Sequence, residues 1–478
     1  MTTTRFACDL AGGYDTLAHV WETMVGSGHA TLALRADWQR QLGRCHRELG
    51  FRYVRCHGIL SDDMGTLMCE RDELVYSFFN ADSMLDFLRS IDMRPVVELS
   101  FMPTALASGD ATVFHYRGNI TPPKHLSAWQ ALIAKLVQHW VDRFGVEEVR
   151  TWMFEVWNEP NLPAFWTGTQ AQYFDLYECA ARAIKAVDPA LRVGGPASAQ
   201  NAWIPDLLEH CSRSGIPIDF ISTHHYPTDA FGEPGDDTEA QLAASHRGVL
   251  REQALQAHRE ARGKPLYYTE WSTSSNPFDP LHDEAYAAAY IVKTVLEVRS
   301  LVEGYSYWTF SDIFEENYFS STPFHGGFGL LTIHGIPKPA YRAYELLHRL
   351  GEQILPVTGS HPTVDVWVTR ADNRLAILIA NGALPRHPIA SERVIVELRG
   401  ITAAPTIHVE RIDDDHANAK RGWLEMGAPE HLSAHDVEKL EALSRLERHP
   451  LKHRRTEAGI EMELQMPPRG TALVTLEL

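Results

Sequence analysis

The segment at residues 152–161, which reads WMFEVWNEPN, constrains the fold of this chain more than any other. Its first half is a short apolar and aromatic run that predicts a buried strand. The run stops at Asn158, Glu159 and Pro160, because proline lacks a backbone donor and cannot continue a strand. An amide and a carboxyl at the end of a buried strand are typical of the mouth of a barrel of parallel strands, where the chemistry of such barrels takes place.

A second aromatic strand is predicted at residues 266–273, LYYTEWST, and it also ends in an acid, Glu270. Taken alone, a glutamate at a strand end is more often part of a surface salt bridge. Two such acids in one barrel could face each other across a single pocket, and paired carboxyl groups are what cleavage of a glycosidic bond requires. We therefore predict that Glu159 and Glu270 are the catalytic pair.

The chain from about residue 30 to 345 alternates between predicted strands and amphipathic helices. This alternation predicts an α/β fold, a (β/α)8 TIM barrel. No Gly-x-Gly-x-x-Gly motif opens a helix after the first strand, which weakens the alternative of a nucleotide-binding sheet. An eighth strand is expected before residue 35, with Ala30–Leu34 as its candidate. The other seven are expected at residues 51–57, 94–101, 152–157, 192–196, 220–226, 266–270 and 305–310.

After Gly351 the pattern changes to short segments with period-two alternation, such as Thr363–Thr369. This change predicts a C-terminal antiparallel β-sandwich. We expect a catalytic barrel at residues 12–350 and a sandwich at 351–478, with residues 1–11 pairing with the sandwich. One charged helix at Ser433–Leu446 interrupts the strands, and it suits either an interface or a solvated surface. The sequence leaves the oligomeric state open.

The formal net charge of −18 argues against nucleic acid or an anionic membrane as a partner. No apolar run approaches the roughly 18 residues of a membrane span, and the N-terminal residues do not form a secretion signal. The six cysteines are far apart and fit neither a zinc site nor a disulfide framework. We expect a cytoplasmic protein that acts on a small oligosaccharide.

Two further strand residues, Arg55 and His57, share a face because they are two positions apart. Arg55 could pair with a catalytic carboxylate, and His57 could bond a sugar hydroxyl. A buried ion pair below the pocket explains the two residues equally well. Phe114 is on a loop that could line the same mouth.

The strand that ends in His224, His225 and Tyr226 offers a proton donor and two potential metal ligands. Tyr226 could donate its phenol proton to the nucleophilic carboxylate and keep it ionised. The two histidines point to opposite faces because they are neighbours on a strand. No third ligand stands at a suitable spacing, and the chain has no His-Glu-x-x-His motif. We therefore expect neither a metal nor a cofactor.

Five motifs together resemble family 39 of the glycoside hydrolases: FEVWNEPN at 154–161, YTEWS at 268–272, HHY at 224–226, YVRCHG at 53–58 and FGLL at 328–331. The resemblance extends over nearly the whole chain. It implies a retaining enzyme without a cofactor, with Glu159 as acid/base and Glu270 as nucleophile. It also implies that the sugar is bound by Asn158, His225, Tyr226, Trp308, Glu315 and Glu316.

The best-known activities of that family, β-xylosidase and α-L-iduronidase, differ in what the pocket must offer to carbon five of the sugar. Iduronate carries a carboxylate there and needs Arg or Lys opposite it, whereas xylose carries no substituent. The loop at residues 310–328 contains Asp312, Glu315 and Glu316 but neither Arg nor Lys, which favours xylose.

We therefore expect an exo-acting xylan 1,4-β-xylosidase that releases xylose from the non-reducing end of short β-1,4-xylo-oligosaccharides by double displacement. Two alternatives stay open. One is another glycosidase of the same family, such as an α-L-iduronidase or an arabinosidase. The other is a carbohydrate-binding barrel without catalysis, which would require that one of the two glutamates be missing or misplaced.

Overall fold

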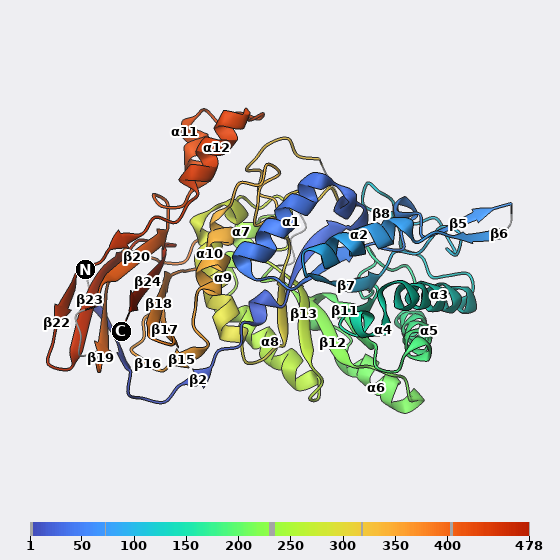
Figure 1. Ribbon diagram of the computed structural model, residues 1–478, viewed down its shortest axis with the longest axis horizontal. Helices are drawn as coiled ribbons and strands as arrows, with labels where there is room; N and C mark the ends of the chain where they lie inside the picture. The colour runs from blue at the N-terminus through green and yellow to red at the C-terminus, as the bar shows by residue number, and fades with distance from the viewer. Residues whose placement is uncertain (1–2, 72, 229–234, 317–318, 402–404, 478) are drawn as a thin grey trace.

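The (β/α)8 barrel predicted from the alternation of strands and helices is present. The computed structural model describes residues 3–71, 73–228, 235–316, 319–401 and 405–477. Eight parallel strands close into a barrel in the order β10-β11-β12-β13-β14-β3-β4-β7 (Figure 1). Their bounds are β3 Met24–His29, β4 Tyr53–His57, β7 Arg94–Leu99, β10 Met153–Val156, β11 Arg192–Ser198, β12 Phe220–His225, β13 Leu266–Trp271 and β14 Gly304–Tyr307.

Helices pack around the outside of the barrel, as Figure 1 shows. In the parts of the chain that the structure describes, none of them has the length and apolarity needed to cross a bilayer. The first helix ends at Gly50, which adopts the left-handed conformation with φ 78°. The helices are α1 Ala36–Leu49, α2 Phe79–Ser90, α3 Leu126–Phe144, α4 Val146–Val149, α5 Gln170–Val187, α6 Ile204–Ser214, α7 Thr238–Ala243, α8 Val249–Glu260, α9 Ala285–Val298 and α10 Pro339–His348.

The first barrel strand does not lie where we predicted it. The expectation for Ala30–Leu34 is wrong, because that segment is a 3₁₀ helix and the strand is β3, just before it. β3 contains Gly26 and Gly28, and glycine is a poor strand former. A Cβ atom on Gly26 would lie 2.4 Å from Cε3 of Trp308. Glycine is therefore needed at this position so that the indole ring can lie against the strand.

The interior of the barrel changes from apolar to charged along the strands. Side chains on one face of a strand recur every two residues, so successive layers can differ in character. The layer near the amino ends is an apolar cluster of Met24, Val96, Met153 and Phe220. Two residues further along β7 and β10 are the fully buried Glu98 and Glu155, and the fully buried Arg55 takes the same place on β4, two residues after Tyr53, which packs against the cluster. The charged layer thus lies directly beneath the carboxyl ends of the strands.

The C-terminal part of the chain forms two stacked sheets, ordered β16-β1-β19-β23-β22 and β2-β15-β17-β18-β24-β20-β21, around an apolar core. This architecture confirms the predicted sandwich, although one of its pairings, β1 with β19, is parallel. The strands are β1 Thr3–Asp9, β2 Asp15–Thr16, β15 Gln353–Leu355, β16 Val357–Thr358, β17 Val364–Ala371, β18 Arg374–Asn381, β19 Glu392–Arg399, β20 Ile407–Ile412, β21 His449–Pro450, β22 His453–Arg455, β23 Gly459–Met466 and β24 Thr471–Glu477.

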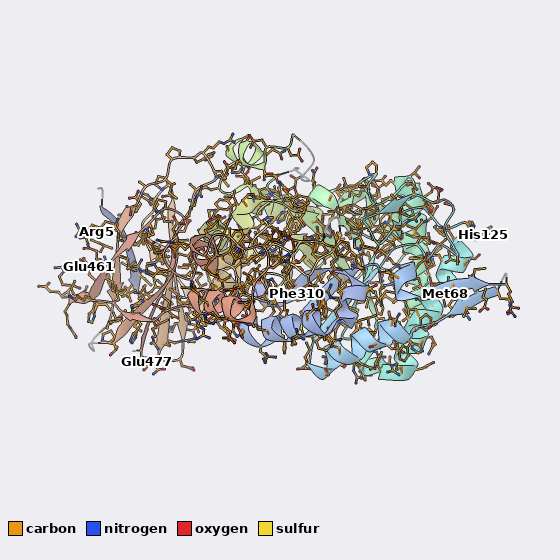
Figure 2. The ribbon with its side chains drawn as sticks, turned by 90° about the horizontal axis from the view of Figure 1, so that it is seen from above. Arg5, Met68, His125, Phe310, Glu461 and Glu477 are labelled. Carbon is orange, nitrogen blue, oxygen red and sulfur yellow. The ribbon has the colours of Figure 1, made fainter. Side chains whose placement is uncertain are left out.

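The N-terminal segment belongs to both sheets of the sandwich. Strand β1 lies between β16 and β19, and its Arg5 forms an ion pair of 2.8 Å with Glu461 at the far end of the molecule (Figure 2). Strand β2 pairs with β15 in the other sheet. We propose domain boundaries near residues 12 and 350, and β2 extends the sandwich a few residues beyond the first of these.

Two helices, α11 (Ala419–Glu425) and α12 (Ala434–Leu443), project from the sandwich (Figure 1). They contact the barrel, where Arg342 of α10 donates to the carbonyl oxygen of Ser444. The helix predicted near Ser433 is α12, and Ser433 forms a capping box with Asp436. Trp423 of α11 packs in one apolar cluster with Phe324, which belongs to the loop after β14. The insertion therefore supports a loop that leads into the barrel mouth.

Candidate active site

A pocket opens at the carboxyl ends of the barrel strands, and its empty space, including the open mouth, is about 820 Å³. A concave site of this size is typical of a small-ligand pocket. Glu159 and Glu270 both line it. The other predicted residues that line it are His57, Phe114, Asn158, Tyr226, Trp308 and Glu316.

The two glutamates face each other across this pocket. An oxygen of Glu159 lies within 4.8 Å of an oxygen of Glu270, and the two residues are only 6% and 7% exposed. This spacing agrees with the roughly 5–5.5 Å of retaining glycosidases and is shorter than the roughly 6.5–9.5 Å of inverting ones. The two acids therefore have the geometry that a double displacement requires.

The backbone turns sharply where the fourth barrel strand ends. Trp157 and Glu159 both have positive φ angles, 73° and 43°, in a region that residues other than glycine seldom occupy. The backbone N–H of Glu159 donates to the carbonyl oxygen of Ala197 at 2.8 Å, which fixes the turn against the neighbouring strand. Strain of this kind is often found at functional sites, and here it directs the Glu159 carboxyl into the pocket.

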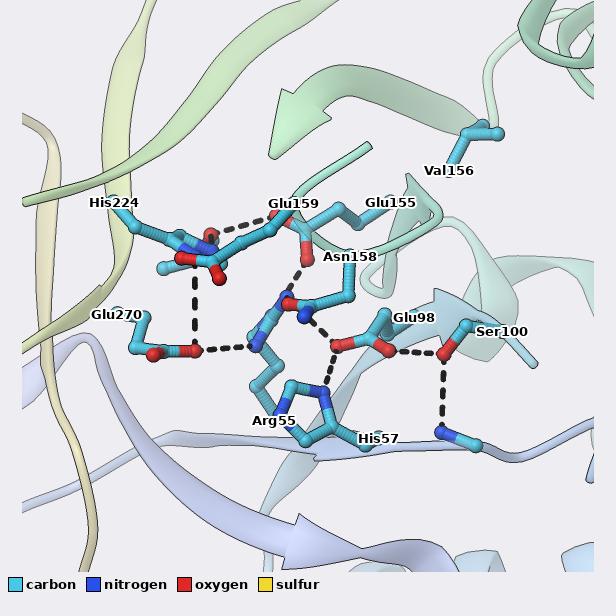
Figure 3. Close-up of polar contacts among 12 residues, drawn as sticks. Arg55, His57, Glu98, Ser100, Glu155, Val156, Asn158, Glu159, His224 and Glu270 are labelled. Carbon is cyan, nitrogen blue, oxygen red and sulfur yellow. Dashed lines mark hydrogen bonds and ion pairs between the residues drawn. The ribbon is translucent and has the colours of Figure 1, made fainter. Parts of the chain in front are cut away.

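A buried arginine organises the floor of the site (Figure 3). The Arg55 Nε donates to Glu155 at 2.6 Å, and its two Nη atoms lie 2.7 Å from Glu98 and 3.3 Å from Glu270. The Arg55 Nη2 also donates to Asn158 Oδ1 at 2.9 Å. Three carboxylates can be buried here because one guanidinium, which is always charged, pairs with all of them. Our expectation that Arg55 contacts a catalytic carboxylate agrees with this geometry.

The surroundings of the two glutamates separate their pKa values. Burial raises the pKa of both, and the charge of Glu270 raises that of Glu159 further, to well above its ordinary value. For Glu270, the charges of Arg55 and His57 and the hydroxyl of Tyr226, which donates to Oε1, oppose the effect of burial. Glu270 therefore ionises first, and Glu159 keeps its proton.

The prediction that His225 binds the sugar is wrong, and the histidine beside the carboxyl groups is His224. Its Nδ1 lies 2.9 Å from Glu159 Oε1 and 3.6 Å from Glu270 Oε2. His225 instead stacks on Tyr268 at 3.8 Å between ring centroids, on the outer side of the barrel wall. The reason is the alternation of side chains along β12, because residues at even positions from Phe220 onward point inward.

The two neighbouring acids after β14, Glu315 and Glu316, lie in different surroundings. Glu316 is buried in the pocket, and its Oε1 lies 3.6 Å from His57 Nε2. Glu315 has a positive φ of 52° and forms an ion pair with Arg35 away from the pocket lining. The expectation that both acids contact the sugar is therefore wrong for Glu315, since the chain turns between the two residues.

Replacing each of these acids with alanine is expected to separate them. Glu316→Ala should lower kcat/KM by about 10- to 100-fold, the effect of losing one hydrogen bond to a charged or strongly polarised group. Glu315→Ala should change kcat/KM less than about threefold, because its partly exposed ion pair with Arg35 lies outside the pocket and contributes little. Steady-state kinetics on an aryl glycoside would measure both, and a larger loss in Glu315→Ala than in Glu316→Ala would contradict the assignment.

Sequence reasoning did not identify Glu98 or Glu155 as parts of the site. Both are inside strands that read as apolar, in PVVEL and MFEV. Their position in the sequence could have indicated them, because a carboxylate in the middle of a buried strand must be paired with a cation or with hydrogen-bond donors. His57 completes this pairing, with its Nδ1 2.7 Å from Glu98 Oε2.

Glu159, His224 and Glu270 form a group whose ligand atoms lie within 4.8 Å of one another, close enough to surround a metal ion. The positive Arg55 lies 3.3 Å from Glu270, and Tyr226 donates to the same carboxylate. A guanidinium in contact with a ligand opposes the binding of a cation. The expectation of a site without a metal stays a prediction, and these contacts favour it.

Comparison with known proteins agrees with the pair of facing glutamates in this pocket. Residues 9–455 match the model of the glycosyl hydrolases family 39. A β-xylosidase from Caldicellulosiruptor saccharolyticus is 50% identical over 96% of this chain and 95% of its own length. A β-xylosidase from Geobacillus stearothermophilus is 36% identical over 98% and 94%.

The fold agrees with a solved structure of the same kind. The crystal structure of a monomeric β-xylosidase from Caulobacter crescentus superposes with a TM-score of 0.87 at 34% identity, covering 99% of both chains. The family match extends from the barrel into the sandwich, and the structural match covers both parts of the chain. The chain therefore belongs to family 39 of the glycosyl hydrolases.

Proposed function

We propose that this chain is a retaining, exo-acting β-xylosidase that releases xylose from the non-reducing end of short β-1,4-xylo-oligosaccharides. The observation that carries the proposal is the close approach of Glu159 and Glu270, within 4.8 Å, in surroundings that raise the pKa of Glu159 more than that of Glu270. The β-xylosidases to which the chain is similar along nearly its whole length support the choice of sugar.

The proposed reaction has two displacements. In the first, the Glu270 carboxylate attacks the anomeric carbon while Glu159 gives its proton to the leaving oxygen. In the second, Glu159 takes a proton from water, whose oxygen displaces Glu270 from the anomeric carbon. Tyr226 and Arg55 hold the Glu270 carboxylate in place, and Asn158, held by Arg55, is positioned for the sugar 2-hydroxyl.

The choice of xylose over iduronate rests on the charge of the pocket. Among the described residues that line it, none is Arg or Lys, and Glu316 stands beside the catalytic pair. A substrate carboxylate would meet this acid without a cation to bind it. The rings of Trp308, Phe314 and Phe328 form one apolar cluster on the lining and suit a pentose without a substituent on carbon five.

The proposal is tested with a panel of aryl glycosides. The β-xyloside is expected to be cleaved with a kcat/KM at least about tenfold above that of the α-L-arabinoside and far above that of the α-L-iduronide. Proton NMR at early times should show β-xylose as the first product, because two displacements retain configuration. Release of α-xylose first would contradict the two-step mechanism, and preference for the iduronide would contradict the substrate.

We further propose that the enzyme works in the cytoplasm on imported short oligosaccharides. All six cysteines are free thiols, which suits a reducing compartment.

A further inference from the structure

A line of hydrogen bonds runs beneath the pocket from Arg55 to Glu159. The Arg55 Nε donates to Glu155 Oε2 at 2.6 Å, and the Thr269 hydroxyl donates to Glu155 Oε1 at 2.7 Å. The Nε2 of His224 lies 3.2 Å from Thr269 Oγ1, and its Nδ1 lies 2.9 Å from Glu159 Oε1. All five residues are buried, so water cannot readily replace any of these bonds.

The direction of these bonds follows from counting protons. The carboxylate of Glu155 forms an ion pair with the permanently charged guanidinium of Arg55 and only accepts hydrogen bonds. A threonine hydroxyl has a single proton, and Thr269 gives it to Glu155. Its oxygen can then only accept from His224, so the His224 ring carries its proton on Nε2.

The same count fixes the proton on Glu159. Burial, followed by the positive charges of Arg55 and His57, lowers the pKa of His224 well below its ordinary value, so the ring is neutral. A neutral ring with a proton on Nε2 presents a lone pair at Nδ1. A carboxylate oxygen 2.9 Å away would place two acceptors against each other, whereas a protonated Glu159 donates to Nδ1.

We propose that Thr269 and Glu155 are positioning residues that hold His224 in the Nε2-protonated tautomer, so that its Nδ1 accepts the acid proton of Glu159. The inference rests on the proposed role of Glu159 as the acid. It adds a reason why that carboxyl recovers its proton in each cycle. After Glu159 has protonated the leaving oxygen, its carboxylate faces the His224 lone pair, and this contact favours taking the proton of the incoming water.

Other charged and titratable groups also face Glu159, and they influence its pKa together with His224. Arg55 favours the ionised form of Glu159, whereas nearby carboxyl groups favour the protonated form. The groups that face Glu159 lie on β4, β7, β12 and β13 and on the segments that follow β12 and β14. They are Arg55, Glu98, His224, Tyr226, Glu270 and Glu316.

Replacement of Thr269 with valine, which keeps the shape and removes the hydroxyl, tests the inference. Without that oxygen, Nε2 has lost its acceptor, and the ring can adopt the other tautomer, whose Nδ1–H stabilises an ionised Glu159. The alkaline limb of the pH profile of kcat/KM should move to lower pH by about one unit. At neutral pH, xylobiose should be hydrolysed more slowly, by up to about tenfold, because a shift of one pH unit lowers the protonated fraction of Glu159 by no more than that. An activated aryl xyloside should be slowed much less. Thr269→Ser should restore both properties.

Thr223→Val is a matched control, because Thr223 is equally buried on the neighbouring strand and donates only to the carbonyl oxygen of Ser198. It should leave the alkaline limb where it is in the wild type. An unmoved limb in Thr269→Val, or an equal shift in Thr223→Val, would overturn the inference.

A direct measurement does not depend on any variant being folded. In wild-type protein labelled with ¹⁵N-histidine, His224 should show a protonated Nε2 and an unprotonated Nδ1 from about pH 5 to 7. A neutral ring protonated at Nδ1 would overturn the proposal. A wild-type enzyme that cleaves neither xyloside would instead contradict the proposed function, while the NMR result would still test the tautomer.

Discussion

Glu270→Gln is expected to lower kcat/KM for an aryl β-xyloside by at least about 10⁴-fold, the scale of losing a covalent nucleophile. An amide has the size of the carboxyl but cannot attack the anomeric carbon. It also cannot neutralise Arg55 Nη1, which lies 3.3 Å from Glu270 Oε2. Steady-state kinetics with a sensitive chromogenic leaving group would measure the residual rate.

Labelling of the wild type provides a second measurement of the same assignment. An activated 2-fluoro-xyloside should form the covalent intermediate faster than it is hydrolysed, because the fluorine destabilises the oxocarbenium-like transition state and the good leaving group accelerates only the first step. Mass spectrometry should then find the added mass on the peptide that contains Glu270. The melting temperature of Glu270→Gln serves as the control for folding. A variant that keeps more than a few per cent of the wild-type rate, or a label on another residue, would refute the assignment.

Glu159→Ala is expected to have the second-largest effect, and its size should depend on the leaving group. Xylobiose needs a proton on its leaving oxygen, so the kcat/KM of the variant for xylobiose should be about 10²- to 10⁴-fold lower than that of the wild type. An aryl xyloside with a very acidic phenol departs without that proton and should lose far less in its first step. Because the deleted carboxyl is also the base of the second step, the covalent intermediate should accumulate and lower both kcat and KM.

Two further properties of Glu159→Ala follow from the geometry of the pocket. Azide should accelerate it and yield β-xylosyl azide, because the anion fits the space of the missing side chain and needs no base. The alkaline limb of the pH profile should disappear, since burial and the charge of Glu270 raise the pKa of Glu159 and make it the group that loses its proton there. An unchanged alkaline limb, or equal losses on the two kinds of substrate, would assign the acid to another residue.

The barrel strands that are apolar and aromatic could be predicted from the sequence. The prediction failed for β3, whose composition is determined by a residue from a distant part of the chain. Strand β10 ends at Val156 and strand β13 at Trp271, each within one residue of the end predicted from the sequence. Strand β3 has two glycines and no apolar run. Its sequence depends on Trp308, which is nearly 300 residues away and occupies the space of the missing side chain at Gly26.

The site shows the same division. The sequence identifies Glu159, because it is an acid at a strand end followed by proline. It does not show which of the two histidines at 224–225 faces the pocket, because that depends on how β12 is oriented in the closed barrel. The resemblance to a family favoured His225, and the inward face belongs to His224. The separation of Glu315 from Glu316 depends in the same way on a turn with positive φ.

The sequence by itself determined the alternation that makes a barrel, the change to period two that makes a sandwich, and the two strand-end glutamates. These features follow from local hydrophobic periodicity and from proline, which act on neighbouring residues. Only the tertiary structure decided which carboxyl groups share the buried charge of Arg55 and which polar side chains pair with one another beneath the pocket. Glu98, Glu155 and Thr269 come from different strands, and burial forces each polar atom to find a partner that no single strand contains.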